Sequence, residues 1–380
     1  MDVLCGIIQL CLGGKPSDNQ NQSQYPLQPV DQQQQQLQQP SYPPQQLSPQ
    51  QPFKPQHPHQ QLHGGSYADA AGQSTGPIIH QPPFLSSDNI PHTPQAQVSA
   101  PTQQELSSLS AACQRLWDHD NNRLTPGKDF VLNLQRKTYV SNQEDAAREP
   151  LFQHVDGSLF SKYPTYSKFL SLLENFTIEE GVAEKVTDAR LANERQFIDL
   201  IYLTAPIQYL HKYLVAKGMA PADALQFKTI LTKTWFELYK RRVKNDTCAF
   251  EHAFHGEVRD SEVIGFHNWI SFYVEEKAGR ADYRGFILPK SKSGRGAHPT
   301  GNEHVLSFQL SWHGDLKPVS SFLIGVSPEY EIALYTLCFF AGKEDVPIPI
   351  VIDEVDCEVV VHRFTNHTGP KIGSAYVSLV

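Results

Sequence analysis

A short stretch in the second half of the chain holds most of the residues whose types could do chemistry. Glu251, His252, His255 and Glu257 stand within seven residues, and His267 follows ten residues later. An unperturbed imidazole has a pKa near ~6.5, so a neutral and a protonated histidine can coexist near neutral pH and act as base and acid. Imidazole and carboxylate groups are also common metal ligands. The residues alone therefore leave acid–base catalysis and metal binding open.

Longer motifs around these residues carry a specific resemblance. Phe250–Glu257, Gly265–Tyr273 and Lys317–Glu331 closely resemble segments of the EndoU (XendoU-like) endoribonuclease family. Leu116–Leu124 upstream and Gly373–Tyr376 downstream extend the likeness. It covers the chain from residue 103 to the end, and several linked motifs in one order make it highly specific.

The resemblance implies a reaction and a cofactor. Members of the family cleave single-stranded RNA at uridines by attack of the RNA's own 2′-hydroxyl, leaving 2′,3′-cyclic phosphate and 5′-hydroxyl ends. Many cellular members need Mn²⁺. In strict terms the reaction is that of an RNA lyase, although such enzymes are often grouped with hydrolases.

The resemblance also implies a role for individual residues. The family's catalytic histidines match His252 and His267, and its catalytic lysine matches Lys317, whose ammonium would stabilise charge on the phosphorane. We expect His267 to be the base and His252 the acid, and the reverse assignment stays open. By the same resemblance, Ser321, Ser374 and Tyr376 match positions that bind the uridine. Glu251 and Glu257 match acidic residues that support the site.

The ligands of the metal are not identified by the sequence. Asp118, Asp120 and Asn122 superficially resemble the start of a calcium-binding loop. Arg123 occupies the position where that loop requires glycine, so the pattern fails and we interpret it as a polar turn. Mn²⁺ would then act through RNA phosphates or through conformational ordering.

Two other functions remain as alternatives. The spacing His-x-x-His-x-Glu resembles the ligand set of cupin-like metal enzymes, which would use His252, His255 and Glu257 and would leave Lys317 without a role. The second alternative is an RNA-binding module without catalysis, which would not need a titrating pair of histidines.

The chain divides by composition into a tail and a folded region. The first hundred residues hold 23 glutamines and 15 prolines, and a segment of this kind cannot bury enough apolar surface to offset the entropy of ordering. We therefore predict that 1–102 is disordered, and that a helical lobe over 103–244 is followed by a catalytic lobe over 245–380. The predicted fold class is α+β, with antiparallel sheets and short helices in the catalytic lobe.

Helical signals in the first lobe are local. Apolar residues recur at helical spacing over Leu106–Leu116, and an apolar-rich stretch over 190–217 is interrupted at Pro206. Thr177 with Glu180 has the pattern of a capping box. Pro221 suits the first turn of another helix. The predicted buried stripe of that helix consists of Leu225, Ile230, Leu231, Trp235, Leu238 and Tyr239.

The second lobe combines strand patterns with helices. Ser327 and Gly342 are suited to begin and end one helix. We expect another over 266–274 with His267 in its first turn, where the positive end of the helix dipole helps to keep the imidazole neutral. Strands are predicted at Tyr283–Leu288, His304–Trp312, Ser320–Gly325, Pro349–Ile352, Val355–Phe364 and Ala375–Val380.

The charge balance restricts where RNA can lie. The chain has a formal net charge of −8, so a phosphate-binding surface must be local. One basic run comes shortly after the histidines and is predicted to guide RNA toward them. It consists of Lys277, Arg280, Arg284, Lys290, Lys292 and Arg295.

Cysteine usage and the chain's first residues bear on localisation. Six cysteines occur without any Cys-x-x-Cys pair, which favours reduced thiols in a cytoplasmic protein. Secretion is the alternative, because Val3–Leu12 is apolar and four asparagines stand in glycosylation triplets, although no positive charge precedes the apolar run. No window is long and apolar enough to span a membrane, so we expect no stable membrane association. We expect a monomer.

Overall fold

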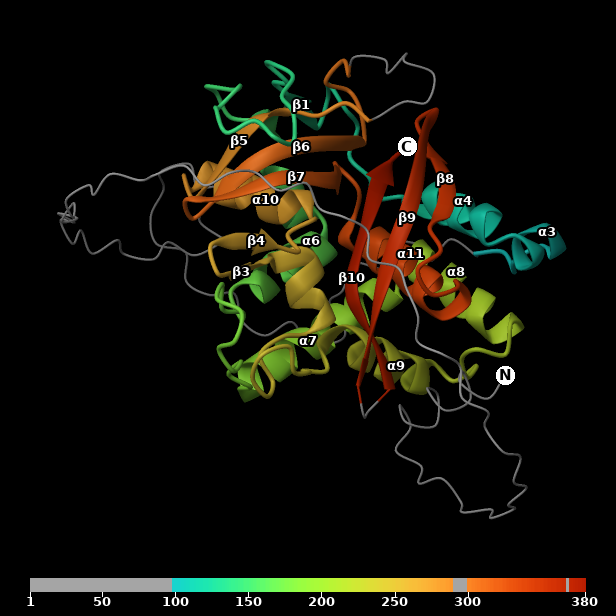
Figure 1. Cartoon of the computed structure of the whole chain (residues 1–380). Helices are drawn as coiled ribbons and strands as arrows, with labels where there is room; N and C mark the ends of the chain where they lie inside the picture. Colours follow the sequence, from blue (N-terminus) through green and yellow to red (C-terminus); the bar gives the residue numbers. More distant parts are fainter. Residues whose placement is uncertain (1–97, 290–298, 367–368) are drawn as a thin grey trace, which may run out of the picture. The chain divides into compact units, whose positions relative to one another are not determined.

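The computed structural model describes residues 98–289, 299–366 and 369–380. Figure 1 shows helices and several small sheets in the described part, and the predicted α+β class with antiparallel sheets is confirmed. Most of the predicted tail, residues 1–97, lies outside the described residues. The described residues cluster as one unit, and the predicted boundary between 244 and 245 stays a prediction.

The described chain begins at a buried side chain. Val98 is buried, and its carbonyl accepts a hydrogen bond from Lys212. Thr102 and Glu105 form a capping box at the start of α3, because each side chain binds the other's backbone N–H. The predicted helical spacing after it is confirmed by α3 (Gln103–Ser107) and α4 (Leu109–His119).

The long apolar-rich stretch forms two helices, as its interruption predicts. Thr187 caps the first helix, and Pro206 lies in the first turn of the second, where its missing N–H leaves no hydrogen bond unmade. The helices of this part of the chain are α5 (Ser158–Lys162), α6 (Pro164–Leu173), α7 (Asp188–Tyr202), α8 (Ala205–Ala216) and α9 (Ala224–Phe236).

Two local predictions in this region are wrong. No helix begins at Thr177, whose backbone N–H and hydroxyl both donate to the buried carboxylate of Glu184, at 3.0 and 2.7 Å. Pro221 precedes α9, which begins after the capping residue Asp223. Of the stripe predicted for this helix, Leu225 is 73% exposed, and Leu238 and Tyr239 lie beyond the end of α9 at Phe236. Thr177 binds a tertiary partner instead of capping a helix, and α9 is capped by Asp223 instead of beginning at Pro221.

The strands pair antiparallel in small sheets. Among the described residues, two three-stranded sheets have the orders β5-β6-β7 and β10-β9-β8, and two hairpins pair β1 with β2 and β3 with β4. The six predicted strands correspond to β5 through β10, with shifted ends. The strand bounds are β1 (Phe130–Leu132), β2 (Phe152–Val155), β3 (Glu257–Arg259), β4 (Glu262–Ile264), β5 (Ala281–Phe286), β6 (Val305–Trp312), β7 (Asp315–Leu323), β8 (Ile348–Ile352), β9 (Val355–Asn366) and β10 (Gly369–Leu379).

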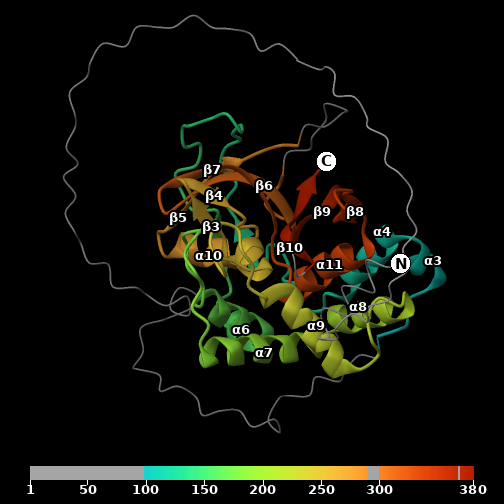
Figure 2. The same cartoon turned by 60° about the horizontal axis from the view of Figure 1, so that its bottom comes forward.

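One helix is buried on nearly all sides. The side chain of Ser327 caps α11 (Pro328–Ala341), and Gly342 ends it, as predicted. Thirteen of its fourteen residues are buried, since it contacts α4, α6 and α8 as well as β9 and β10. Figures 1 and 2 both show α11 lying between the helices and the β8–β9–β10 sheet. A helix buried all round carries apolar residues on every face, which explains its near-continuous apolar sequence.

A buried ion-pair network joins α7 to the segment that precedes it. Arg190 donates to Glu184 at 2.6 Å and to Glu194 at 2.9 Å, and the three side chains are only 2%, 1% and 5% exposed. Burial raises the pKa of Glu194, although the Arg190 guanidinium opposes the shift. The arginine therefore neutralises carboxylates that have no access to water.

Replacing Arg190 by methionine should leave those carboxylates buried without their partner. We expect R190M to lower the free energy of unfolding by about 3–5 kcal/mol, as seen when one member of a buried pair is removed. Urea denaturation followed by circular dichroism measures it. The control is R195M on the same helix, at an exposed arginine, which should change stability by less than about 0.5 kcal/mol. Equal shifts in the two variants would contradict the role of the network.

Candidate active site

The predicted catalytic residues come from three separate segments that meet in space. His252 lies on the π-helix η2 (Glu251–His255), His267 in the segment before α10 (Trp269–Lys277), and Lys317 on β7. β10 packs against both η2 and β7, so it brings Ser374 and Tyr376 to the same region. Figure 1 shows α10 beneath β7, with β10 beside them.

The two histidine segments are joined by their backbones. The N–H of Phe266 donates to the carbonyl of His252 at 3.1 Å, and the N–H of His267 donates to the carbonyl of Ala253 at 2.9 Å. Gly265 makes this approach possible, since a Cβ built at that position would lie 1.8 Å from the His252 carbonyl oxygen. The relative position of the two imidazoles is therefore set by main-chain contacts.

Adding a methyl group at Gly265 should force these segments apart. Both Gly265 and Gly279 have positive φ, +62° and +70°, but nothing lies within 4 Å of a Cβ at Gly279. We expect G265A to lose about 100-fold or more in kcat, because displacements near 1 Å can cost that much. The kcat of G279A should stay within a few-fold of the wild-type value, since this substitution introduces the same backbone strain as G265A but no steric clash. Similar losses in both would show that strain alone is responsible. RNA cleavage rates and circular dichroism of both variants measure this.

His252 shares a hydrogen bond with Glu257. Its Nδ1 lies 2.6 Å from Glu257 Oε2, and both side chains are buried. Burial, followed by the positive charges of Arg241 and Lys317, holds the pKa of His252 well below its usual range. Burial also raises the pKa of Glu257 to about 7, against the opposing effect of Arg241. Both shifts favour a neutral imidazole beside a protonated carboxyl, the arrangement in which Nε2 of His252 carries a hydrogen that it can donate.

His267 is held by Ser320 and stacks on Tyr376. The Ser320 hydroxyl donates to the Phe266 carbonyl at 3.3 Å, and its oxygen lies 3.0 Å from Nδ1 of His267. The arrangement that satisfies both contacts has Nδ1–H of His267 donating to the Ser320 oxygen, which leaves Nε2 as an acceptor. The ring is 4.8 Å from that of Tyr376, at an interplanar angle of 21°.

The position of His267 relative to the helix differs from the prediction. The predicted helix exists, but α10 begins at Trp269 and Asn268 is its cap, so His267 lies before the first turn. Asn268 accepts from the backbone N–H groups of Ile270 and Ser271 and donates to Glu331 at 2.6 Å. Burial is the first cause that lowers the pKa of His267, and the positive charge of Lys317 is the next. The ring is thus neutral at pH 7 mainly because it is desolvated.

Lys317 is buried beside the segment that carries His267. Its ammonium donates to the carbonyl of Gly265, and burial lowers its pKa to about 7. The same ammonium lowers the pKa of both His252 and His267, which places all three groups in one electrostatic site.

The predicted substrate-binding residues surround this site from two strands. Ser321 on β7 shares a hydrogen bond of 2.6 Å with Ser307 on the neighbouring strand. Ser374 and Tyr376 are two residues apart on β10 and so project from the same face. The hydroxyl of Tyr376 lies 3.4 Å from Nε2 of His362. The structure brings Tyr376 against His267, and it places the two serines on strands that flank the predicted catalytic residues.

The predicted acidic residues have different surroundings. Glu257 bonds His252, whereas Glu251 is buried among acidic neighbours, and burial followed by the charges of Glu257 and Glu184 raises its pKa well above the usual range. Glu251 Oε2 has no hydrogen-bond partner among the described residues. Glu251 is therefore a buried carboxyl group close to Glu257 and Glu184.

The cupin-like ligand set does not assemble. Nδ1 of His255 donates to the carbonyl of Gly256 at 2.8 Å, and the ring packs against Phe176 and Trp312. In the part of the chain that the structure describes, no three His, Cys, Asp or Glu side chains are placed to hold a metal ion. The protein's own residues therefore do not fit a metal cage of that kind.

The calcium-loop-like pattern is also accounted for structurally. α4 ends at His119, and Asp120 is its capping residue. The buried carboxylate of Asp120 accepts from the backbone N–H of Ser327 at 3.1 Å, at the start of α11. Asn122 donates to Glu329 at 2.6 Å. These side chains tie a turn to a buried helix, as expected for a polar turn.

The basic run is only partly described. Arg280 binds Glu275 at 2.7 and 3.0 Å, and Arg284 donates to the carbonyl of Gln143 at 2.7 Å. Lys277 is exposed at the end of α10. Lys290, Lys292 and Arg295 lie outside the described residues. The role of this run in guiding RNA stays a prediction.

Comparisons with known proteins show the family of this chain. The family model for endoribonuclease XendoU matches residues 108–377. The chain belongs to this family. It is 41% identical over 275 residues to uridylate-specific endoribonuclease B of Danio rerio, covering 70% of this chain and 94% of that protein. It is also 41% identical over 281 residues to poly(U)-specific endoribonuclease-A of Xenopus laevis, covering 72% and 94% of the two chains.

A solved structure has the same fold. The structure of XendoU, described as a splicing-independent snoRNA-processing endoribonuclease, aligns with a TM-score of 0.63 at 39% identity. The alignment covers 72% of this chain and 96% of that chain. The resemblance of the motifs to the EndoU family is thereby confirmed.

Two positioning residues of this family member were missed by the sequence reasoning. Ser320 precedes the predicted Ser321 and fixes the tautomer of His267, while Asn268 anchors the following helix to Glu331. Ser320 lies in the family-like motif Lys317–Glu331, but the sequence does not show which of two adjacent serines faces the histidine. Asn268 was detectable as a cap, since asparagine is favoured there and apolar helical residues follow it.

Proposed function

We propose that this protein is an endoribonuclease that cleaves single-stranded RNA at uridines by attack of the 2′-hydroxyl, leaving a 2′,3′-cyclic phosphate and a 5′-hydroxyl. Membership of the XendoU family and the names of its relatives support the RNA substrate and the uridine preference. The observation that carries the mechanism is that His252, His267 and Lys317 meet in one place, with Nδ1 of one imidazole bonded to Glu257 and Nδ1 of the other to Ser320.

Each proton has a defined route in this mechanism. Nε2 of His267 takes the proton of the 2′-hydroxyl, and the resulting 2′-oxygen attacks the adjacent phosphorus. The bond from phosphorus to the 5′-oxygen breaks, and Nε2 of His252 donates its proton to that oxygen. As Nε2 gives up this hydrogen, the carboxyl proton of Glu257 moves to Nδ1 of His252, so the imidazole stays neutral and Glu257 becomes a carboxylate.

Lys317 stabilises the charge that develops during the reaction. Its ammonium is compact, buried and held by the Gly265 carbonyl, so it is pre-organised toward the phosphorane oxygens. Ser321, Ser374 and Tyr376 contact the uridine: hydroxyl groups can bond the base edge, and the Tyr376 ring can stack on the base or the ribose.

Mn²⁺ assists the reaction through the RNA in this proposal. Hard oxygen ligands suit Mn²⁺, and RNA phosphates supply them. The described side chains offer no three-ligand cage, so we assign the ion to phosphate oxygens and route no proton through it.

Two alternatives fit the site less well. The metal-enzyme alternative requires His252, His255 and Glu257 as ligands, yet no three such side chains among the described residues are placed to hold a metal ion, and Nδ1 of His252 is bonded to Glu257. The RNA-binding alternative gives no reason for two desolvated histidines beside a buried lysine.

Cleavage of a short RNA with one uridine tests the mechanism. Wild-type protein should give a cyclic phosphate end, faster with added Mn²⁺, whereas H252A and H267A should lose at least about 100-fold in rate. A substrate with 2′-deoxyuridine should resist cleavage. H255N is the control. Its cleavage rate should stay within a few-fold of the wild-type rate if the proposed mechanism holds, and it should be inactive if the cupin-like alternative holds. Cutting of the deoxy substrate would refute 2′-hydroxyl attack.

The pKa shifts predict the pH dependence of kcat/KM, which reports the free enzyme. Above pH about 7 Lys317 loses its charge and Glu257 loses the proton that it shares with His252, so the rate should fall. Below pH 7 the rate should hold, because the pKa of His267 lies well below its usual range and the base stays neutral.

K317R provides the matched variant for this profile. A guanidinium keeps its charge across the range, so the alkaline fall should become shallower if Lys317 contributes to it. A wild-type rate that rises from pH 7 to 9 would contradict the assignment of acid and cation.

We also propose a cytoplasmic, monomeric protein. Four cysteines in the described region are buried and form no disulfide: Cys113, Cys248, Cys338 and Cys357. No helix in the described ranges is long and apolar enough to cross a membrane. Light scattering and fractionation of cells that express the full chain test the two statements.

A further inference from the structure

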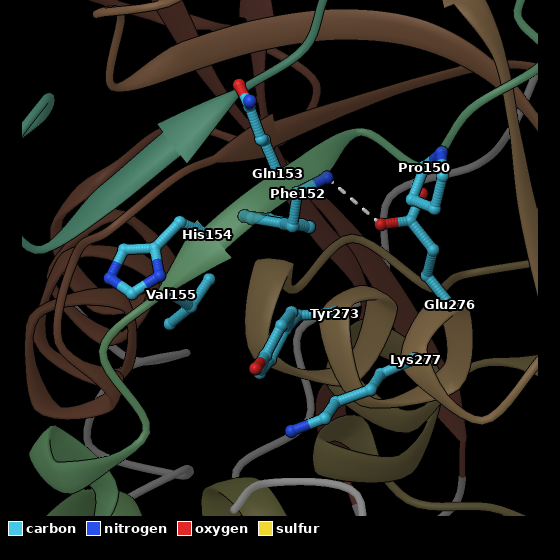
Figure 3. A pocket seen from close by; sticks show the side chains of 8 residues that line it. All are labelled: Pro150, Phe152, Gln153, His154, Val155, Tyr273, Glu276 and Lys277. Atoms are coloured by element: carbon cyan, nitrogen blue, oxygen red, sulfur yellow. Dashed lines mark hydrogen bonds between the residues drawn. The ribbon is translucent and has the colours of Figure 1, made fainter.

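A pocket of about 420 Å³ lies at the end of α10 that is remote from His267. It opens between this end of the helix and strand β2, and Figure 3 shows side chains from both elements around it. It is lined by Pro150, Phe152, Gln153, His154, Val155, Tyr273, Glu276 and Lys277. None of these is a predicted catalytic or uridine-binding residue.

The pocket combines an apolar floor with a polar rim. Phe152, Val155 and Tyr273 are buried residues of the floor, whereas Gln153 and His154 are exposed on β2. A floor of this kind excludes water from a flat apolar group, and exposed amide and imidazole groups can bond the edge of that group.

Charge in the pocket favours an anion. Lys277 is exposed and forms no ion pair among the described residues, while its ammonium lies 5.7 Å from the Tyr273 ring centroid. The one carboxyl group of the lining belongs to Glu276. Its two oxygens accept from the backbone N–H groups of Leu151 and Phe152, at 2.7 and 3.1 Å. The carboxyl is therefore engaged by the protein's backbone, and the ammonium is left for a ligand.

The pocket lies at the far end of the helix that follows His267. α10 has nine residues, so its two ends are separated by about 12 Å at a rise of ~1.5 Å per residue. The ring of Phe152 lies 6.0 Å from that of Trp269, two residues after His267, and both rings are buried. The pocket and the histidine segment therefore contact opposite ends of one short helix.

We infer that this pocket is a second RNA subsite, which binds a nucleotide that flanks the cleaved uridine. The base would cover the apolar floor, with its edge toward Gln153 and His154, and a phosphate would pair with Lys277. Single-stranded binding proteins combine apolar or aromatic surfaces with positive charge in the same way. The inference rests on the proposed cleavage of RNA, and it adds a preference for substrates long enough to occupy both places.

Charge reversal at Lys277 tests this subsite with two substrates. One is a uridine-containing dinucleotide, and the other is a twelve-nucleotide RNA with one central uridine. For the longer RNA, K277E should raise KM about 3- to 10-fold at unchanged kcat, the effect expected for one lost phosphate contact. The dinucleotide should be cut by K277E and wild type with the same constants. K277R should restore wild-type values, because it keeps the charge.

A control variant and a binding measurement complete the test. K217E makes the same change in net charge at an exposed lysine at the end of α8 (Figure 2), and it should leave both substrates unaffected. Fluorescence anisotropy can measure binding of the twelve-mer that carries 2′-deoxyuridine. The slope of log Kd against log salt concentration should be smaller by about 0.7 in K277E than in wild type.

Three results would overturn the inference. They are an unchanged KM and salt slope in K277E, an equal loss with the dinucleotide, or the same loss in K217E. Failure of the proposed function would look different, since wild-type protein would then cut neither RNA.

Discussion

The close approach of two backbone segments underlies the whole site. Gly265 lets the segment before α10 lie against η2, and the hydrogen bonds from Phe266 and His267 to the carbonyls of His252 and Ala253 hold it there. Main-chain contacts have little conformational freedom, so they fix the distance between the imidazoles better than side-chain contacts could. Lys317 and Ser320 then bind the same segment from β7, which makes the strand a third support.

Burial determines the protonation of the site. The same desolvation that lowers the pKa of the histidines and of Lys317 raises that of Glu257. Neutral imidazoles result, yet they differ in tautomer because their Nδ1 atoms meet different partners. Ser320 accepts from one ring, and the carboxyl of Glu257 shares a proton with the other. The division between base and acid is thus produced by the neighbours of two chemically identical side chains.

The sequence predicted the fold well where the signal is local, and less well where a distant partner intervenes. The cap at Ser327, the interruption at Pro206 and the alternating strands were recognised because propensity and tertiary packing agree there. Thr177 was misread because the buried carboxylate of Glu184 takes the place of a helix cap. The membership of His267 in the helix was misread because Asn268 is the better cap.

The sequence by itself determined the family, the α+β class and the identity of the residues that could do the chemistry. Their types and motif order are properties of the chain and need no coordinates. Only the tertiary structure decided that Ser320 orients His267, that His255 faces an aromatic core and that Glu251 is buried close to other carboxyl groups. The physical reason is that these roles depend on which groups meet across long sequence separations. Burial and hydrogen-bond partners arise from that packing, and they set both charge and tautomer.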